Sequence, residues 1–126
     1  MNPSEQEFIT IVNTTPGLCE NGIGTELFFK NTGVNLVGSK KLLLKKYREF
    51  IICCTWLDKM CVPEATVAWN SPTSRILADF AKRPTYVCNG SMIAAIISKG
   101  IPYTLNPASP NVNVGISRDS SCFGTR

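Results

Sequence analysis

The side chains with the most obvious chemical potential in this chain are its cysteines, Cys19, Cys53, Cys54, Cys61, Cys88 and Cys122. No two of them form a Cys-x-x-Cys pair, and the spacing of Cys54 and Cys61 does not match a zinc knuckle. The chain has no histidine, so it lacks the commonest general base and the commonest metal ligand. The sequence therefore predicts a protein that is not an enzyme and holds no metal or cofactor.

Cys88 is the one thiol whose surroundings could activate it. It lies just before a predicted helix, and the dipole at a helix N-terminus can lower a thiol pKa. Activation would also need a base, and a histidine is absent. We therefore expect Cys88 to be structural, with a reactive thiol as the alternative.

Positive charge is the second chemical feature, and it is concentrated in one short stretch. The formal net charge is +4, and five of the thirteen Lys and Arg residues lie between positions 40 and 48: Lys40, Lys41, Lys45, Lys46 and Arg48. Cations at helical spacing suit contacts with phosphates. The alternatives are an ordinary solvated helix face, or a surface for an acidic protein.

The composition also carries expectations about location and size. The N-terminus MNPSEQEF has neither the basic nor the apolar part of a signal peptide, and no apolar run is long enough to span a bilayer. We therefore expect a cytoplasmic protein with reduced cysteines and no membrane partner. At 126 residues the expectation is a single domain, 1–126.

Residues 1–38 form a glycine-rich segment that leans towards β-structure. The β-branched run at 8–12, FITIV, predicts a short strand or the edge of a helix. Thr25 to Lys30 and Val34 to Val37 are predicted strands, joined by a turn at Asn31-Thr32-Gly33.

Three helices are predicted after this segment. Ser39 is the expected N-cap of a long helix from Lys40 to Met60, which Pro63 ends. A shorter helix is predicted from Thr73 to Lys82, between Pro72 and Pro84. Asn89, Gly90 and Ser91 would cap a third helix from Met92 to Lys99, with Gly100 in a left-handed conformation after its end.

The chain then changes to a period of two, which predicts a hairpin. Ile101, Tyr103 and Leu105 alternate with polar or proline positions, and Val112, Val114 and Ile116 do the same beyond the turn NPASP. Residues 118–126 read as a flexible tail. The predicted fold class is α+β: a three-helix core with a C-terminal β-hairpin, preceded by the short glycine-rich segment.

This order of a long helix, a short helix, a capped helix and a two-stranded wing over residues 39–117 resembles a winged helix-turn-helix domain. The resemblance is architectural, since no motif in the chain is specific to the family. It implies that the third helix enters the major groove and that residues near its N-terminus reach base edges. On this chain those positions are Asn89, Ser91, Met92 and Lys99, with Asn106 and Ser109 at the wing tip.

The chain differs from the winged-helix pattern in two ways that affect the predicted base contacts. Lys99 is the single basic residue of the third helix, and the connection RPTYVCN is longer than the compact turn of the simple motif. Winged helices also bind proteins, and a neutral, isoleucine-rich third helix suits that use.

Two functions follow as predictions. The first is a small regulatory or accessory protein that binds nucleic acid, DNA rather than RNA, with Asn89 and Ser91 nearest the bases. Its predicted phosphate contacts are Lys41, Lys45, Lys46, Arg48, Lys82, Arg83 and Lys99. The second is an adaptor or inhibitor that binds an acidic protein, with the third helix and Tyr103 as an apolar anchor. Steep salt dependence is expected of the first function only.

Overall fold

The structure is a computed structural model, and it describes residues 3–60, 87–106 and 109–115. Within these ranges the chain forms helices and two small antiparallel hairpins, so the predicted α+β class is confirmed. The elements, in chain order, are α1 (Glu5–Thr14), β1 (Leu18–Cys19), β2 (Gly22–Ile23), α2 (Glu26–Thr32), α3 (Leu36–Leu44), α4 (Tyr47–Met60), α6 (Asn89–Ser98), β3 (Tyr103–Leu105) and β4 (Val112–Val114).

The β-branched run at 8–12 lies inside helix α1. The Ser4 hydroxyl caps the helix by accepting a hydrogen bond from the Glu7 backbone N–H at 3.1 Å. Ser4 followed by glutamate three residues later is a capping-box pattern, and it starts the helix despite the β-branched residues. Phe8 and Val12, one turn apart, are fully buried, so packing of one face stabilises α1 further.

The two strands predicted at Thr25–Lys30 and Val34–Val37 are wrong. Thr25 caps α2 by accepting from the Phe28 N–H at 3.2 Å, and Gly33 ends it in a left-handed conformation (φ 73°). Gly33 is therefore a helix C-cap and not part of a hairpin turn. The hairpin of this segment lies earlier, where Leu18 pairs with Ile23 and Cys19 with Gly22.

The single long helix predicted from Lys40 to Met60 is two helices, α3 and α4. Asn35 is the N-cap of α3, and Ser39 lies within that helix, where its hydroxyl accepts from the Glu20 N–H at 3.1 Å. The helix ends at Lys45, and the break requires neither glycine nor proline. It allows α3 to pack on β1 and α1 while α4 packs on α6, so long-range contacts decide it.

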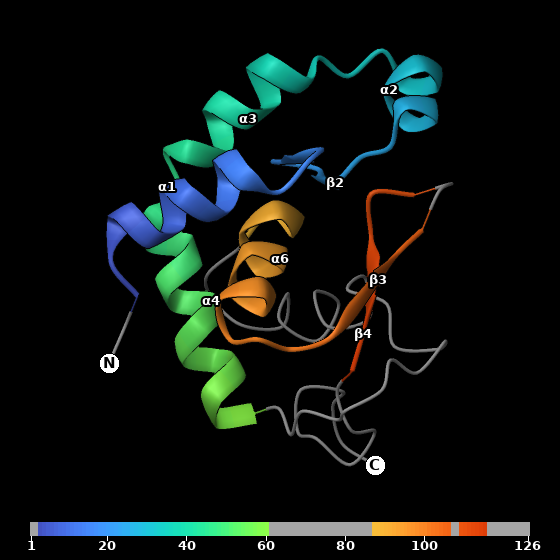
Figure 1. The fold of residues 1–126 in the computed structure, drawn as a ribbon. Helices are drawn as coiled ribbons and strands as arrows, with labels where there is room; N and C mark the ends of the chain where they lie inside the picture. The colour runs from blue at the N-terminus through green and yellow to red at the C-terminus, as the bar shows by residue number, and fades with distance from the viewer. Residues whose placement is uncertain (1–2, 61–86, 107–108, 116–126) are drawn as a thin grey trace.

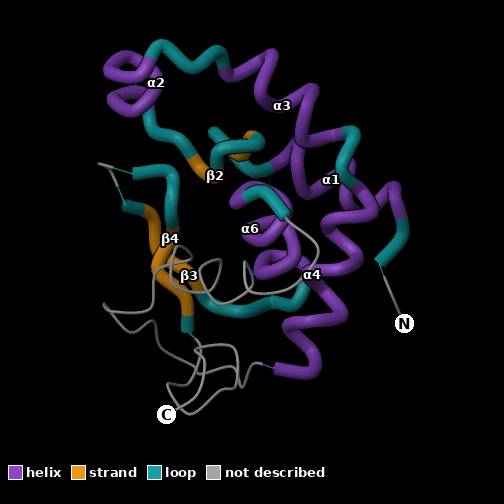
Figure 2. The backbone as a smooth tube through the Cα atoms, turned by 180° about the vertical axis from the view of Figure 1, so that it is seen from behind, coloured by secondary structure: helices purple, strands orange, loops and turns teal. Residues whose placement is uncertain are grey.

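Helix α6 is the centre of the described fold. Cys88 is its N-cap, so the helix begins three residues before the predicted start at Met92. Residues 90–96 are all buried, because α6 packs against α4, α1 and both strands of the first hairpin. Figures 1 and 2 show it lying between α4 and the β3–β4 hairpin. Gly100 follows in the predicted left-handed conformation (φ 69°).

The predicted C-terminal hairpin is confirmed. Tyr103 pairs with Val114 and Leu105 with Val112 in antiparallel register. Val112 and Val114 are buried and Asn113 between them is not, which is the alternation of a strand with one face on a core. The Ile23 N–H donates to the Pro110 carbonyl at 2.9 Å and so joins this hairpin to the first one.

Several predictions lie outside the described residues. They are the helix Thr73 to Lys82, the ending of the long helix at Pro63, the strand residue Ile116 and the tail 118–126. Because its second helix is among them, the winged-helix resemblance stays a prediction. Within the described residues, no helix combines the length and the apolar character needed to cross a bilayer.

The close packing of α6 against β1 can be tested by adding a methyl group at Gly90. A Cβ built on Gly90 would overlap the backbone carbonyl oxygen of Cys19, which cannot move aside as a flexible side chain can. Gly90→Ala should therefore destabilise the protein by about 1–3 kcal/mol, the usual cost of overpacking. Urea denaturation followed by circular dichroism measures this change.

Gly38→Ala is the matched control. Gly38 is exposed in α3, and the nearest atom to a built Cβ is the Asn35 Oδ1 at 3.6 Å. Alanine should stabilise a helix interior there by up to about 1 kcal/mol. A Gly90→Ala protein as stable as the unsubstituted chain would contradict the close approach of α6 to β1.

Candidate functional site

A polar cluster surrounds the buried N-terminus of α6, and it is built on Glu49 of α4. The Glu49 Oε1 accepts from the Cys88 backbone N–H at 2.8 Å and from the Ser91 hydroxyl at 3.1 Å. The Cys88 sulfur accepts from the Ser91 N–H at 3.4 Å. A carboxylate at a helix N-terminus is stabilised by the helix dipole and by these hydrogen bonds. We call Glu49, Cys88 and Ser91 the cap cluster.

Lys46 connects the cap cluster to the first hairpin. Its Nζ lies 3.0 Å from the Glu20 Oε2 and 3.6 Å from the Glu49 Oε2. The hydrogen bond with Glu20 raises the pKa of Lys46 above its ordinary value. Lys46 is thus engaged by two carboxylates within the fold, and it is not a free cation of the kind predicted for phosphate contacts.

Burial raises the pKa of Cys53, Cys54 and Cys88, which disfavours their reactive thiolate forms. Cys19, Cys53, Cys54 and Cys88 are free and buried. Burial raises the pKa of Cys88 even though Ser91 donates to its sulfur, and burial raises the pKa of Cys54 to about 11. The lowering of the Cys88 pKa by the helix dipole is therefore not observed. Across the part of the chain that the structure describes, no three His, Cys, Asp or Glu side chains gather as metal ligands would.

Several exposed cations of the described residues lie near the junction of α3 and α4. Lys41, Lys45 and Arg48 are exposed, and Lys40 is half-buried. Lys41 and Lys45 are four residues apart, so they share one face of α3. Among the described residues, no carboxylate forms an ion pair with any of these four side chains. We call Lys40, Lys41, Lys45 and Arg48 the basic junction.

The structure buries two of the predicted base-contacting residues and holds a third by a hydrogen bond. Ser91 and Met92 have no exposed surface, and the Asn89 side-chain amide donates to the Asn21 carbonyl at 2.9 Å. Because α6 is covered on several sides in this arrangement, Ser91 and Met92 have no surface to offer a base, and their predicted base contacts stay a prediction. Ile93 and Ile96 are core residues as well, so the predicted apolar anchor also stays a prediction.

The remaining predicted residues are dispersed. Lys99 forms an ion pair with Asp58 at 2.8 Å, at the opposite end of α6 from the cap cluster. At the hairpin tip, the Ser109 hydroxyl accepts from the Asn111 N–H at 3.2 Å, and Asn106 is half-buried. Tyr103 is half-buried against the core. Lys82 and Arg83 lie outside the described residues.

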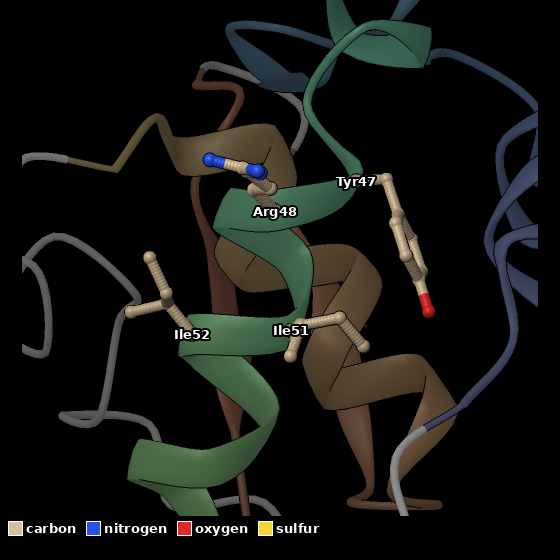
Figure 3. Close-up of a pocket in the computed structure, with 4 residues that line it drawn as sticks. All are labelled: Tyr47, Arg48, Ile51 and Ile52. Atoms are coloured by element: carbon tan, nitrogen blue, oxygen red, sulfur yellow. The ribbon is translucent and has the colours of Figure 1, made fainter.

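A hollow of about 390 Å³ opens on α4 beside the basic junction. It is lined by Tyr47, Arg48, Ile51 and Ile52, and Figure 3 shows these side chains leaving successive turns of the helix. We call it the α4 hollow. Ile52 is an apolar residue in the middle of α4, yet it is 37% exposed. Its spacing from Arg48 and Thr55, which are also exposed, was the available signal.

The cap cluster leads to a prediction about stability. Glu49→Ala should destabilise the protein by about 1–3 kcal/mol, since it leaves the Cys88 N–H and the Ser91 hydroxyl without their acceptor. Glu49→Gln keeps an acceptor oxygen and should cost less. Urea unfolding midpoints of the two variants test this order. Glu26→Ala, which removes an exposed first-turn carboxylate of α2, is the control and should cost under about 1 kcal/mol.

The buried thiols lead to a prediction about reactivity. At neutral pH, iodoacetamide should modify Cys54 and Cys88 far more slowly in the folded protein than in urea, because a raised thiol pKa leaves little thiolate. As the pH rises from 9 to 11, the unfolded state loses the Cys54 proton first, so this thiol should lower the stability of the fold. Peptide mass spectrometry resolves each cysteine. Fast, selective labelling of Cys88 at neutral pH would contradict the prediction.

Comparison with known proteins adds no relative to this description. No protein-family model, no curated protein and no solved structure matches the chain. A function therefore has to be argued from the cap cluster, the basic junction and the α4 hollow themselves.

Proposed function

We propose that this protein is a small accessory protein that binds nucleic acid, DNA in the first place, through the basic junction between α3 and α4. Lys41, Lys45 and Arg48 would contact phosphates, with Lys40 beside them. The proposal keeps Lys41, Lys45 and Arg48 from the predicted phosphate contacts, and it does not use the third helix, on which the sequence prediction placed the base contacts.

The single observation that carries the proposal is the difference between Lys46 and its neighbours. Lys46 has carboxylate partners at 3.0 and 3.6 Å, whereas the cations of the basic junction have none among the described residues. Glu49, the one acid within this stretch, is held by the Cys88 N–H and the Ser91 hydroxyl. Cations without carboxylate partners, close together in sequence, suit a phosphate chain, because each contact releases a condensed counterion.

This mode of binding has consequences for specificity and location. Phosphate contacts position a protein on nucleic acid but carry no sequence information by themselves. We therefore propose binding that tolerates many sequences, as suits an accessory role. The free thiols of the described cysteines support a cytoplasmic site of action, where cysteines are kept reduced.

The proposal is tested by the salt dependence of binding. The full chain should bind random-sequence DNA, and the affinity should fall steeply between about 50 and 200 mM salt. The double variant Lys41→Gln with Lys45→Gln should bind more weakly. It should also reduce the slope of log affinity against log salt by about 1.4–1.8, because two phosphate contacts are lost. Fluorescence anisotropy with labelled DNA measures both quantities.

A charge-matched variant separates the basic junction from net charge. Lys30→Gln with Lys59→Gln removes two exposed lysines elsewhere, on α2 and near the end of α4. It should retain most of the salt slope. Thermal unfolding should accompany each measurement, since lysines near the end of α3 also stabilise that helix through its dipole. Absence of DNA binding at low salt, or equal loss in both double variants, would overturn the proposal.

A further inference from the structure

The α4 hollow offers a mostly apolar surface next to a free charge. Tyr47, Ile51 and Ile52 supply carbon surface, and Arg48 is the one charged side chain among its described lining residues. Figure 3 shows Tyr47 and Arg48 projecting from the first turn of α4 in different directions, with the isoleucines one turn further along the helix. The volume of about 390 Å³ lies at the lower end of the range typical of small-molecule sites.

The Tyr47 ring is held in place before any ligand arrives. Its hydroxyl donates to the Pro3 carbonyl at 2.7 Å, and its ring centroid lies 6.1 Å from those of Phe8 and Phe50. A ring fixed on both its hydroxyl and its inner side loses little conformational freedom on binding. Tyr47 is therefore preorganised to offer ring surface to an incoming flat group.

We propose that the α4 hollow receives an unpaired base of single-stranded DNA whose phosphates lie on the basic junction. This inference rests on the proposed function and specifies its ligand. A duplex turns its bases inward and presents phosphates, so it would use the cations and leave the apolar surface empty. A single strand can bind both the α4 hollow and the basic junction. Its bases stack on aromatic and guanidinium groups while its phosphate backbone contacts the cations.

The side chains that line the α4 hollow favour thymine over the other bases, and they favour DNA over RNA. Thymine carries a methyl group that apolar side chains contact, and Ile51 and Ile52 provide such side chains. Recognition of RNA uses the ribose 2′-hydroxyl, for which a paired polar group is needed. The Tyr47 hydroxyl already donates to Pro3, and Arg48 suits a phosphate. An acidic protein segment is the competing occupant.

The test compares probes that share phosphates but differ in their bases. The full chain is titrated with thymidine strands of about 15 nucleotides, a length within the usual site sizes. Parallel titrations use an abasic strand, a uridine RNA strand and a DNA duplex of equal length. Thymidine strands should bind about tenfold more tightly than abasic strands at the same salt, the range expected for stacking of one base. The duplex should resemble the abasic strand, and RNA should lie between.

Ile52→Ser and a control variant show whether the preference for thymidine strands arises in the α4 hollow. Ile52 is exposed and outside the core, so serine there should leave the fold intact. Because Tyr47 still offers its ring, the variant should reduce the preference for thymidine over abasic strands by about two- to threefold, with the salt slope unchanged. Leu27→Ser removes another exposed aliphatic side chain, on α2, and should keep the preference.

The outcomes separate the inference from the proposed function. Equal binding of thymidine and abasic strands, with a steep salt slope, would overturn the inference and leave the basic junction in place. A thymidine preference that Ile52→Ser leaves unchanged would also overturn it. If no strand binds, both proposals fail, and an acidic protein partner takes precedence.

Discussion

Pairing the buried N-terminus of α6 is the constraint on which the rest of this structure depends. The first N–H groups of a helix have no partners within it, and burying one unpaired costs about 1–3 kcal/mol. Here the Gly90 N–H donates to the Glu20 carbonyl at 3.1 Å, and the Cys88 N–H donates to the Glu49 carboxylate at 2.8 Å. Because these acceptors come from the first hairpin and from α4, α6 is buried only when both elements are in place.

The same pairing divides the basic residues into an internal and an external group. Glu49 is occupied by α6, and the Glu20 and Glu49 carboxylates together hold Lys46. Among the described residues, no carboxylate forms an ion pair with Lys45 or Arg48, which lie within two positions of Lys46. The α3–α4 junction therefore keeps its surface charge because the nearby carboxylates of Glu20 and Glu49 are paired with Lys46 and with α6. This is the physical link between the fold and the proposed function.

The order of a capped helix followed by a hairpin does not by itself decide what the helix does. In a winged helix, that helix is left uncovered and can enter a groove. In this chain α1, α4 and the first hairpin cover it, and Ser91, Met92 and Ile93 have no exposed surface. The covered arrangement is favoured, because removing the apolar surface of an isoleucine-rich helix from water lowers the free energy of the folded state. Architecture and function are thus separate questions here.

The sequence by itself determined the features that depend on residues a few positions apart. The left-handed Gly100, the alternation around Val112 and the α+β class were predicted. The capping pattern at Ser4 is also visible in the sequence, although the β-branched run that follows it led to the prediction of a strand or helix edge. Tertiary structure alone decided the break at Lys45, the burial of Ser91 and the exposure of Ile52. Each of these depends on partners far along the chain, because the faces of α3 and α4 are assigned by what packs against them. Local periodicity cannot contain that information.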